Sequence, residues 1–277
     1  MWKYVAGTIV VGSVTYALIK YFAGGVCHCT TRLDGLVVVI TGGNSGIGQA
    51  LALELAQRDS LNNEFSEIYA LVNNAGIFYH PQVLTQDGYE ITLQTNYLGH
   101  FILTHHLLNL LKKSVHARII NVASEAHRNV NVYDLKAVTK CQSEFRSHFV
   151  AYGVSKLALV LFTKELSKKL LNTNVIVNAV NPGNVETNIY RNFPPLSNPW
   201  LYAIQWPLRC ILIKSPRQGA QTLLHSLLTS NRSTGQYYSD CKLVLPSPIA
   251  ANDKIAKEYY DLTLEVLAEW FTTESEC

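Results

Sequence analysis

The sequence predicts one α/β domain built on a doubly wound parallel sheet, because short apolar runs alternate along the chain with longer segments of helical periodicity. The apolar runs are continuous, which is typical of strands that are buried on both faces of a parallel sheet. A chain of 277 residues with 48% hydrophobic content is long enough for one core of ordinary size. An apolar segment at the N-terminus precedes this domain.

The N-terminal segment is nearly unbroken in apolar or small residues from Tyr4 to Ile19, and it continues past Lys20 to Ala23. This is about the minimum length of a membrane-spanning helix, so residues 1–25 are expected to form a membrane anchor. A cleaved secretory signal that ends near Gly25 is the alternative. The basic residues after the segment favour a cytosolic position of the main domain, residues 33–277.

The elements of the main domain begin with a strand at Leu36–Ile40. A glycine-rich turn follows, and Gly46–Arg58 then carries apolar residues at helical spacing. Further strands are expected at 70–72, 117–122 and 175–180, and further helices at 89–111 and 152–171. Strands and helices that alternate in this way form a parallel sheet with helices on both faces.

Charge and cysteine content exclude several classes of function. The formal charge is only +3 and no basic run alternates with aromatic residues, so nucleic acid is not expected as a partner. The six cysteines form no CxxC pair and are too sparse for a disulfide scaffold, so we expect reduced thiols. Cys27-His28-Cys29 has no second Cys/His pair at ligand spacing, and no metal site is expected.

The glycine-rich turn extends from Thr41 to Gly48. Glycines at a strand-to-helix turn let the backbone approach a pyrophosphate, which the N-terminus of the helix can bind. The spacing is TGxxxGIG, and a glycine-rich turn without a ligand is the alternative reading of this motif alone. The candidate cofactor-binding residues of the turn are Gly42, Asn44, Ser45, Gly46, Ile47 and Gly48.

A second motif places Tyr152 and Lys156 four positions apart on a predicted helix, hence on one face of it. A cation beside a phenol can lower its pKa, so that the phenol exchanges a proton near neutral pH. A surface pair without catalytic function is the alternative.

These motifs occur in the order of the short-chain dehydrogenase/reductase family, which the chain resembles from Leu33 to Leu267. The residues that carry the resemblance are TGGNSGIG, NNAG at 73–76, Asn96 and its neighbours, Ser124, YxxxK and Pro182-Gly183. Within the family the chain resembles the NADP-using retinol dehydrogenases of microsomes and mitochondria. That likeness is carried by segments 22–27, 96–104, 124–127, 156–166, 214–216 and 235–238.

The resemblance implies a Rossmann-like fold and a catalytic tetrad of Asn96, Ser124, Tyr152 and Lys156. Tyr152 would exchange the proton at the substrate oxygen, and Ser124 would hydrogen-bond that oxygen. Lys156 would lower the pKa of the tyrosine and bind the nicotinamide ribose, while Asn96 would hold a water that relays protons. The further cofactor-binding residues implied are Asn74, Ala75, Gly76, Pro182, Gly183 and Thr187.

The function implied is that of an oxidoreductase that interconverts a small lipophilic, retinol-like alcohol and its carbonyl in retinoid or lipid metabolism. NADP is the implied cofactor, with NAD as the alternative, and the endoplasmic reticulum membrane is favoured over the mitochondrion. The aromatic-rich segment Pro199–Pro207 is either a substrate lid or simple core. His100, His105 and His106 are expected to be structural or at the surface.

The chain departs from the family pattern between Gly48 and Asn73, which are only 25 positions apart. The family places two further strands and two helices here, and one βαβ unit takes about 30 residues or more. We therefore expect an internal shortening after about Arg58 that removes two inner strands, and with them the residue that reads the adenosine ribose. Glu67 belongs to the later strand and does not replace it. A catalytically silent, membrane-bound binding protein is the alternative function.

Overall fold

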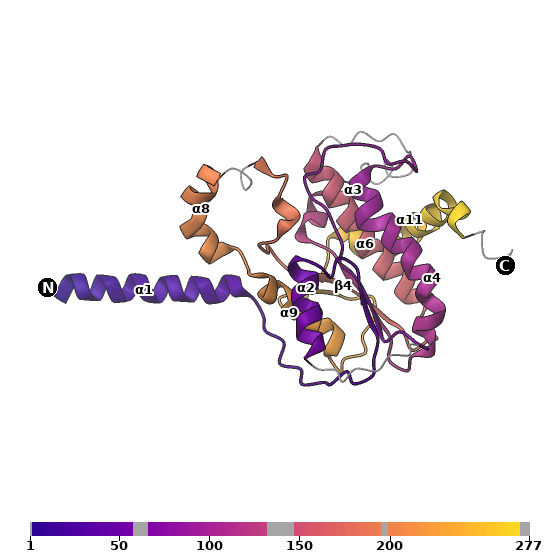
Figure 1. The fold of residues 1–277 in the computed structure, drawn as a ribbon, viewed down its shortest axis with the longest axis horizontal. Helices are drawn as coiled ribbons and strands as arrows, with labels where there is room; N and C mark the ends of the chain where they lie inside the picture. Colours follow the sequence, from indigo (N-terminus) through magenta and orange to yellow (C-terminus); the bar gives the residue numbers. More distant parts are fainter. Residues whose placement is uncertain (1, 58–65, 132–146, 195–198, 272–277) are drawn as a thin grey trace.

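The computed structural model describes residues 2–57, 66–131, 147–194 and 199–271 (Figure 1). Within these residues six strands form one sheet, in chain order from one edge to the other. The strands are β1 (Val38–Ile40), β2 (Ala70–Asn73), β3 (Arg118–Val122), β4 (Ile176–Asn181), β5 (Tyr237–Ser239) and β6 (Lys242–Leu243). Neighbours from β1 to β5 pair in parallel, and β6 pairs antiparallel with β5. The predicted parallel sheet is confirmed.

Helices cover both faces of the sheet, as expected (Figure 1). One face carries α2 (Gly46–Ala56) and α9 (Pro216–Leu228). The other carries α4 (Gly99–Lys113) and α6 (His148–Lys169), and α11 (Asp253–Val266) packs on α6. The remaining helical elements are α1 (Trp2–Ala23), α3 (Ile91–Leu93), η1 (Gln94–Leu98), η2 (Glu125–Asn129), η4 (Asn188–Tyr190), α8 (Pro199–Leu212), α10 (Pro248–Ala251) and η5 (Ala268–Trp270).

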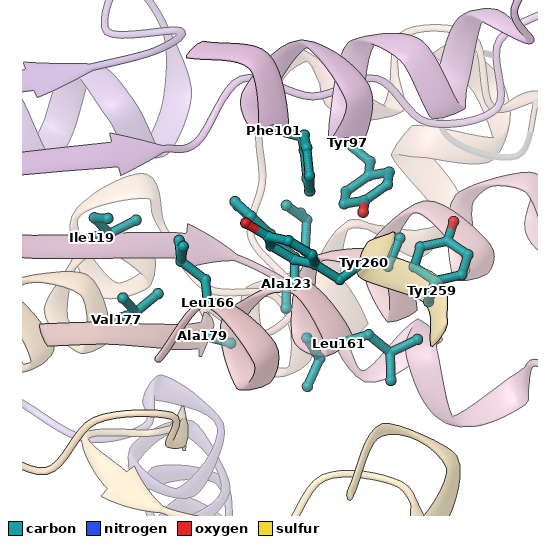
Figure 2. Close-up of a cluster of buried hydrophobic side chains, with 14 of the residues drawn as sticks. Tyr97, Phe101, Ile119, Ala123, Leu161, Leu166, Val177, Ala179, Tyr259 and Tyr260 are labelled. Carbon is teal, nitrogen blue, oxygen red and sulfur yellow. The ribbon is translucent and has the colours of Figure 1, made fainter. Parts of the chain in front are cut away.

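Aromatic side chains fill the core between the sheet, α4, α6 and α11 (Figure 2). Tyr97 and Phe101 are fully buried, and the Tyr97 hydroxyl lies 2.9 Å from the Thr263 hydroxyl of α11. Tyr260, also on α11, stacks on the ring of Phe162 of α6. The C-terminal helix α11 therefore completes the core on this face, because its tyrosines cover rings that would otherwise meet water.

The connections between strands have mixed hands. Every step from β1 to β5 runs in the same direction across the sheet, yet α4 and α6 lie on one face and α2 and α9 on the other. The two pairs of crossovers therefore have opposite hands, whereas about 98% of such connections are right-handed. In an ordinary doubly wound sheet the strand order reverses, which lets helices of one hand reach both faces. The described residues contain no such reversal.

Strand β1 forms one edge of this sheet. It pairs with β2 alone, with Val39 opposite Leu71, and its three residues are half-buried, whereas β2, β3 and β4 are buried throughout. The expected loss of two inner strands is not confirmed, because the pairing of β1 with β2 does not show whether strands are absent or where they would lie. Arg58, where the first helix was expected to end, lies outside the described residues, as do Cys141 and Cys277.

The N-terminal segment is helical from Trp2 to Ala23 and projects from the domain (Figure 1). Within the parts of the chain that the structure describes, no helix combines the length and the apolar character needed to cross a membrane. The spanning anchor expected for residues 1–25 is therefore not confirmed.

Candidate active site

A cavity of about 570 Å³ opens where strands β1 to β4 end. Parallel strands direct their carboxyl ends to the same edge of a sheet, and the loops that follow them surround the cavity. Most of the predicted site residues line it. These residues are Gly42, Asn44, Ser45, Gly46, Ile47, Asn74, Ala75, Gly76, Ser124, Tyr152, Lys156, Pro182, Gly183 and Thr187.

Two predicted residues, Gly48 and Asn96, lie behind the cavity wall, where both are buried. A β-carbon on Gly48 would lie 2.4 Å from the Gly42 carbonyl oxygen and 2.5 Å from Asn74 Nδ2. The first turn of α2 can therefore approach the loop this closely only with glycine at this position.

The glycine turn leaves the N-terminus of α2 directed at the cavity. Gly42 and Gly46 have φ angles of +67° and +55°, a left-handed conformation that glycine adopts without strain. Ser45 precedes the helix, and its side chain makes no capping hydrogen bond. The first amides of α2 thus offer donors and a positive dipole end to an anion, as expected for a pyrophosphate site.

The loop after β2 holds this turn in place. The Thr41 hydroxyl oxygen accepts hydrogen bonds from the backbone amides of Asn74 and Ala75, each 2.9 Å long. Asn74 Nδ2 donates to the Thr41 carbonyl oxygen at 2.9 Å. The NNAG motif thus ties the carboxyl ends of β1 and β2 together.

Asn96 sits on a π-helical turn, η1, in which the amide of Gly99 donates to the carbonyl of Gln94. Its Oδ1 accepts from the Ile77 amide at 2.8 Å, and its Nδ2 donates to the Ile77 carbonyl at 3.0 Å. A β-carbon on Gly76 would lie 3.3 Å from Asn96 Oδ1 and 3.7 Å from Lys156 Nζ. Asn96 is therefore next to the lysine and fixes the loop after β2, while the water relay stays a prediction.

Lys156 is buried on α6, and its Nζ donates a 2.7 Å hydrogen bond to the Val122 carbonyl at the end of β3. Burial lowers the pKa of its ammonium from 10.5 to about 8. At neutral pH the group is mainly charged, and it lies 5.5 Å from the centre of the Tyr152 ring. A buried cation is thus placed one helical turn from the phenol.

Tyr152 lines the cavity from α6, and Ser124 lines it beside the end of β3. Burial raises the pKa of the phenol, the nearby Tyr190 raises it further, and the Ser124 hydroxyl opposes these effects. The expected lowering of this pKa by Lys156 is therefore not confirmed. The predicted tetrad is nevertheless brought together: Ser124 contacts Tyr152, and Lys156 and Asn96 lie behind them.

The histidines near the site are structural. His100 is buried, and burial lowers its pKa to about 4, so the ring is neutral. Its Nδ1 lies 2.9 Å from the Asn96 carbonyl and must carry the proton, which leaves Nε2 to accept from the Thr41 hydroxyl at 2.9 Å. His127 likewise accepts from the Ser247 amide through Nε2, at 3.0 Å, and donates to the Ser124 carbonyl.

An aromatic wall that the sequence analysis missed surrounds Tyr152 on its outer side. Phe78 meets the Tyr152 ring edge-on, with centroids 5.0 Å apart, and also contacts Phe149, Tyr190 and Phe193. The signal was present in the sequence, because Phe78 lies two residues after NNAG and Phe149 lies three residues before the tyrosine of YxxxK. The wall gives the part of the cavity around Tyr152 an apolar surface.

Helix α8 contains the segment expected to be a lid or core. None of its described residues lines the cavity, and Trp200 and Ile204 are 81% and 77% exposed. Neither expectation is confirmed. The residues after β4 that do line the cavity are 182–185 and 187–191.

The residues present fit a nicotinamide cofactor at two of its three parts. The glycine turn and the N-terminus of α2 suit the pyrophosphate, and Gly183, Thr187 and Lys156 line the part of the cavity that the resemblance assigns to the nicotinamide ribose. At the adenosine end, none of the described residues between Gly48 and Asn74 lines the cavity. The side of β1 away from β2 has no strand among the described residues to carry a ribose-reading group.

Comparisons with known proteins agree with this arrangement. A family model described as enoyl-(acyl carrier protein) reductase matches residues 55–205. Human retinol dehydrogenase 12 is 37% identical over 300 aligned positions, which cover 90% of this chain and 91% of that protein. Nine-tenths of 277 residues is about 249, so about 50 of these positions have no residue in this chain.

Solved structures share the fold. A crystal structure of an uncharacterized protein from Mycobacterium paratuberculosis matches with a TM-score of 0.68 at 25% identity, over 88% of this chain and 98% of that one. A 3-alpha-hydroxysteroid dehydrogenase from Pseudomonas, solved with NADH, matches with a TM-score of 0.58 at 20% identity, over 73% and 94% of the two chains. The second likeness concerns the fold alone.

Proposed function

The chain belongs to the short-chain dehydrogenase/reductase family of oxidoreductases, and we propose that it interconverts a lipophilic, retinol-like alcohol and its carbonyl with NADP(H). The observation that carries the proposal is the convergence of Ser124, Tyr152 and Lys156 on one cavity with an aromatic wall. A bound nicotinamide would supply the hydride acceptor or donor. The protein supplies position, proton exchange and exclusion of water.

The proton is exchanged by Tyr152. Its phenol stands beside Ser124, so both hydroxyls can hydrogen-bond one substrate oxygen. In the reducing direction Tyr152 donates its proton to the oxygen that becomes the alcohol. Lys156 stabilises the phenolate that remains, because a buried ammonium one helical turn away acts through a medium of low polarity.

The substrate class follows from the aromatic wall. Phe78 is 9% exposed and Phe149 is 53% exposed, so the wall extends from the buried reaction centre toward solvent. A long apolar molecule can place its polar end at Tyr152 and its apolar body against these rings. A retinoid has this shape, and human retinol dehydrogenase 12 is named for such a substrate.

The shortened cofactor half is part of the proposal. Support comes from the mixed hands of the crossovers, the half-exposed edge strand β1 and the short interval between Gly48 and Asn73. About 50 positions of the alignment with the human protein also have no residue in this chain. We infer that the strands normally outside β1 are absent, which leaves the adenosine without one wall. NADP binding should then be weak but not abolished, because the pyrophosphate and nicotinamide ends are complete.

We also propose that α1 and α8 hold the enzyme at a membrane surface, with the domain on the cytosolic side of the endoplasmic reticulum. The two helices contact each other. On α8 the side chains of Trp200, Ile204 and Leu208, which are spaced four residues apart, form an exposed apolar stripe. Such stripes insert into the interface of a bilayer. Replacing Trp200 and Ile204 by Ser should reduce flotation with liposomes, and unchanged flotation would refute this role.

A glycosylation sequence can report on which side of the membrane the domain lies. Asn231-Arg232-Ser233 is an exposed glycosylation sequence, which only a lumenal domain would have modified. A glycosidase-sensitive shift that disappears in Asn231→Gln would place the domain in the lumen instead.

The catalytic assignment is tested by reduction of all-trans-retinal with NADPH. Tyr152→Phe keeps the ring contact with Phe78 and should lower kcat about 10²- to 10⁴-fold. Tyr190→Phe is the matched control, since it removes a hydroxyl from the same cavity and should leave most activity. Equal rates for the parent and Tyr152→Phe would refute the role of Tyr152.

A further inference from the structure

We propose that the protein binds one Zn²⁺ through Cys27, Cys29 and His225, with Cys241 as the fourth ligand. Cys27 and Cys29 lie in the segment between α1 and β1, and His225 lies in the last turn of α9. The two sulfur atoms and a ring nitrogen of His225 all lie within 4.8 Å of one another. Three ligand atoms from two distant parts of the chain thus lie together, and none of their residues lines the catalytic cavity.

The spacing of these atoms is close to that of a tetrahedral zinc site. Zinc bonds of about 2.3 Å to sulfur and about 2.0 Å to nitrogen place neighbouring ligand atoms about 3.5 to 3.8 Å apart. The site therefore closes with side-chain shifts of about 1 Å. Thiolates with imidazole select zinc over magnesium or calcium, which prefer oxygen.

The fourth ligand comes from the turn between β5 and β6. Cys241 has φ of +59° and follows Asp240 at +51°, a two-residue turn in which the second position is ordinarily glycine. The Cys241 amide donates to the Thr222 hydroxyl of α9 at 3.3 Å, and the Cys241 β-carbon would lie 3.0 Å from a β-carbon on Gly25, two residues before Cys27. The Cys241 sulfur is outside the group of three ligand atoms that lie within 4.8 Å of one another, so its side chain would have to turn toward them. A cysteine in this left-handed conformation is strained, and such strain is typical of residues with a function.

The chain segment that carries Cys27 and Cys29 is already docked on this surface. The Cys27 amide donates to Gln221 Oε1 of α9 at 3.1 Å. A β-carbon on Gly25 would lie 2.2 Å from the Asp240 carbonyl oxygen. The segment therefore packs so closely on the β5–β6 turn that only glycine fits at this position. The backbone thus brings the cysteines to α9 and the turn without the metal, which lowers the entropy lost on binding.

The ion would have a structural function. None of the four residues lines the catalytic cavity. Zinc would join the segment after α1 to α9 and to the β5–β6 turn, and so fix the N-terminal helix to the domain. Ligand spacing along the sequence did not indicate this site, because Cys27 and His225 are 198 positions apart.

The test is the zinc content of the full-length protein, purified under reducing conditions from cells grown with added zinc. We expect about one zinc per chain with an affinity of about 10⁻⁹ M or tighter, as for structural sites. Cys29→Ser and His225→Gln should lose most of this zinc. The control Cys210→Ser, an exposed thiol on α8, should keep it.

A measurement on the unaltered protein covers the case in which those variants do not fold. X-ray absorption at the zinc edge should show sulfur at about 2.3 Å and nitrogen at about 2.0 Å. Absence of zinc after incubation with equimolar Zn²⁺ would overturn the proposal, as would zinc bound only through oxygen. A Cys27–Cys29 disulfide, detected as a mass loss of about two hydrogens, would overturn it too. Unchanged affinity in Cys241→Ser would refute the fourth ligand.

Discussion

Lys156 makes the stability of the fold depend on pH in a calculable way. Burial lowers the pKa of its ammonium from 10.5 to about 8. Between these values the unfolded chain holds a proton that the folded protein has released, so stability rises with pH in this interval and is flat below about 8. The shift corresponds to a cost of about 3 kcal/mol at pH 7, of which about 2 kcal/mol is relieved by pH 9.5.

The perturbation that isolates this effect is Lys156→Met, which keeps the length of the side chain and removes its charge. Urea unfolding of parent and variant is measured at pH 7 and pH 9.5, and the free energies are subtracted so that other titrating groups cancel. The difference should move by about 2 kcal/mol in favour of the parent as the pH rises. Lys112→Met, at an exposed position of α4, is the control and should leave the difference unchanged within about 0.5 kcal/mol.

The variant also loses the 2.7 Å bond to the Val122 carbonyl, so its absolute stability is set by two opposing effects. The pH dependence is free of this complication, because it depends only on the folded and unfolded pKa values of the lysine, which the variant lacks. A difference that stays constant from pH 7 to pH 9.5 would refute the reasoning that Lys156 is a buried cation.

Three further predictions concern the residues around the cavity. Asn96→Ala leaves the amide and carbonyl of Ile77 without their partner and should destabilise the fold by about 1 to 3 kcal/mol in urea unfolding. Gly48→Ala should cost a similar amount, about 1 to 3 kcal/mol, and weaken NADPH binding. Gly43→Ala, whose β-carbon would lie 3.5 Å from the Ile40 carbonyl, should do neither. NADPH affinity, followed by nucleotide fluorescence, should be weak in this chain and rise about tenfold or more when a family-length segment is restored after Arg58; micromolar affinity in the chain as it stands would contradict the open adenosine end.

The sequence located the cavity because its motifs depend on local geometry. A glycine turn after an apolar run places its amides at the carboxyl end of a strand, and a four-residue spacing places Tyr152 and Lys156 on one face of α6. Every parallel strand directs its end to the same edge, so these residues converge without knowledge of tertiary contacts. The helix and strand boundaries agree to within a few residues for the same reason.

The rest depended on contacts between residues distant in the sequence. The aromatic wall forms because Phe78, Phe149 and Phe193 come from three separate segments, and no periodicity relates them. The π-helical turn at Asn96 widens a helix whose sequence reads as regular. Cys27, Cys29 and His225 likewise meet only because the N-terminal segment docks on α9.

The expected loss of two inner strands is not confirmed, and there is a physical reason why the sequence could not place it. An interval that is short along the chain does not say where in the sheet the loss falls. The structure places β1 directly beside β2, at one edge of the described sheet. An edge strand with half-buried residues leaves its outer amides to water, which costs less than burying them unpaired.

Hydride transfer tests the central claim most directly. Full-length protein is incubated with all-trans-retinal and millimolar NADPH that carries deuterium at both C4 positions, and retinol is analysed by mass spectrometry. The account predicts retinol with one deuterium from the parent, at a rate that falls about 10²- to 10⁴-fold in Tyr152→Phe. Folded parent protein that transfers no more deuterium to retinal or to other lipophilic carbonyls than Tyr152→Phe does would contradict the account and favour a catalytically silent binding protein.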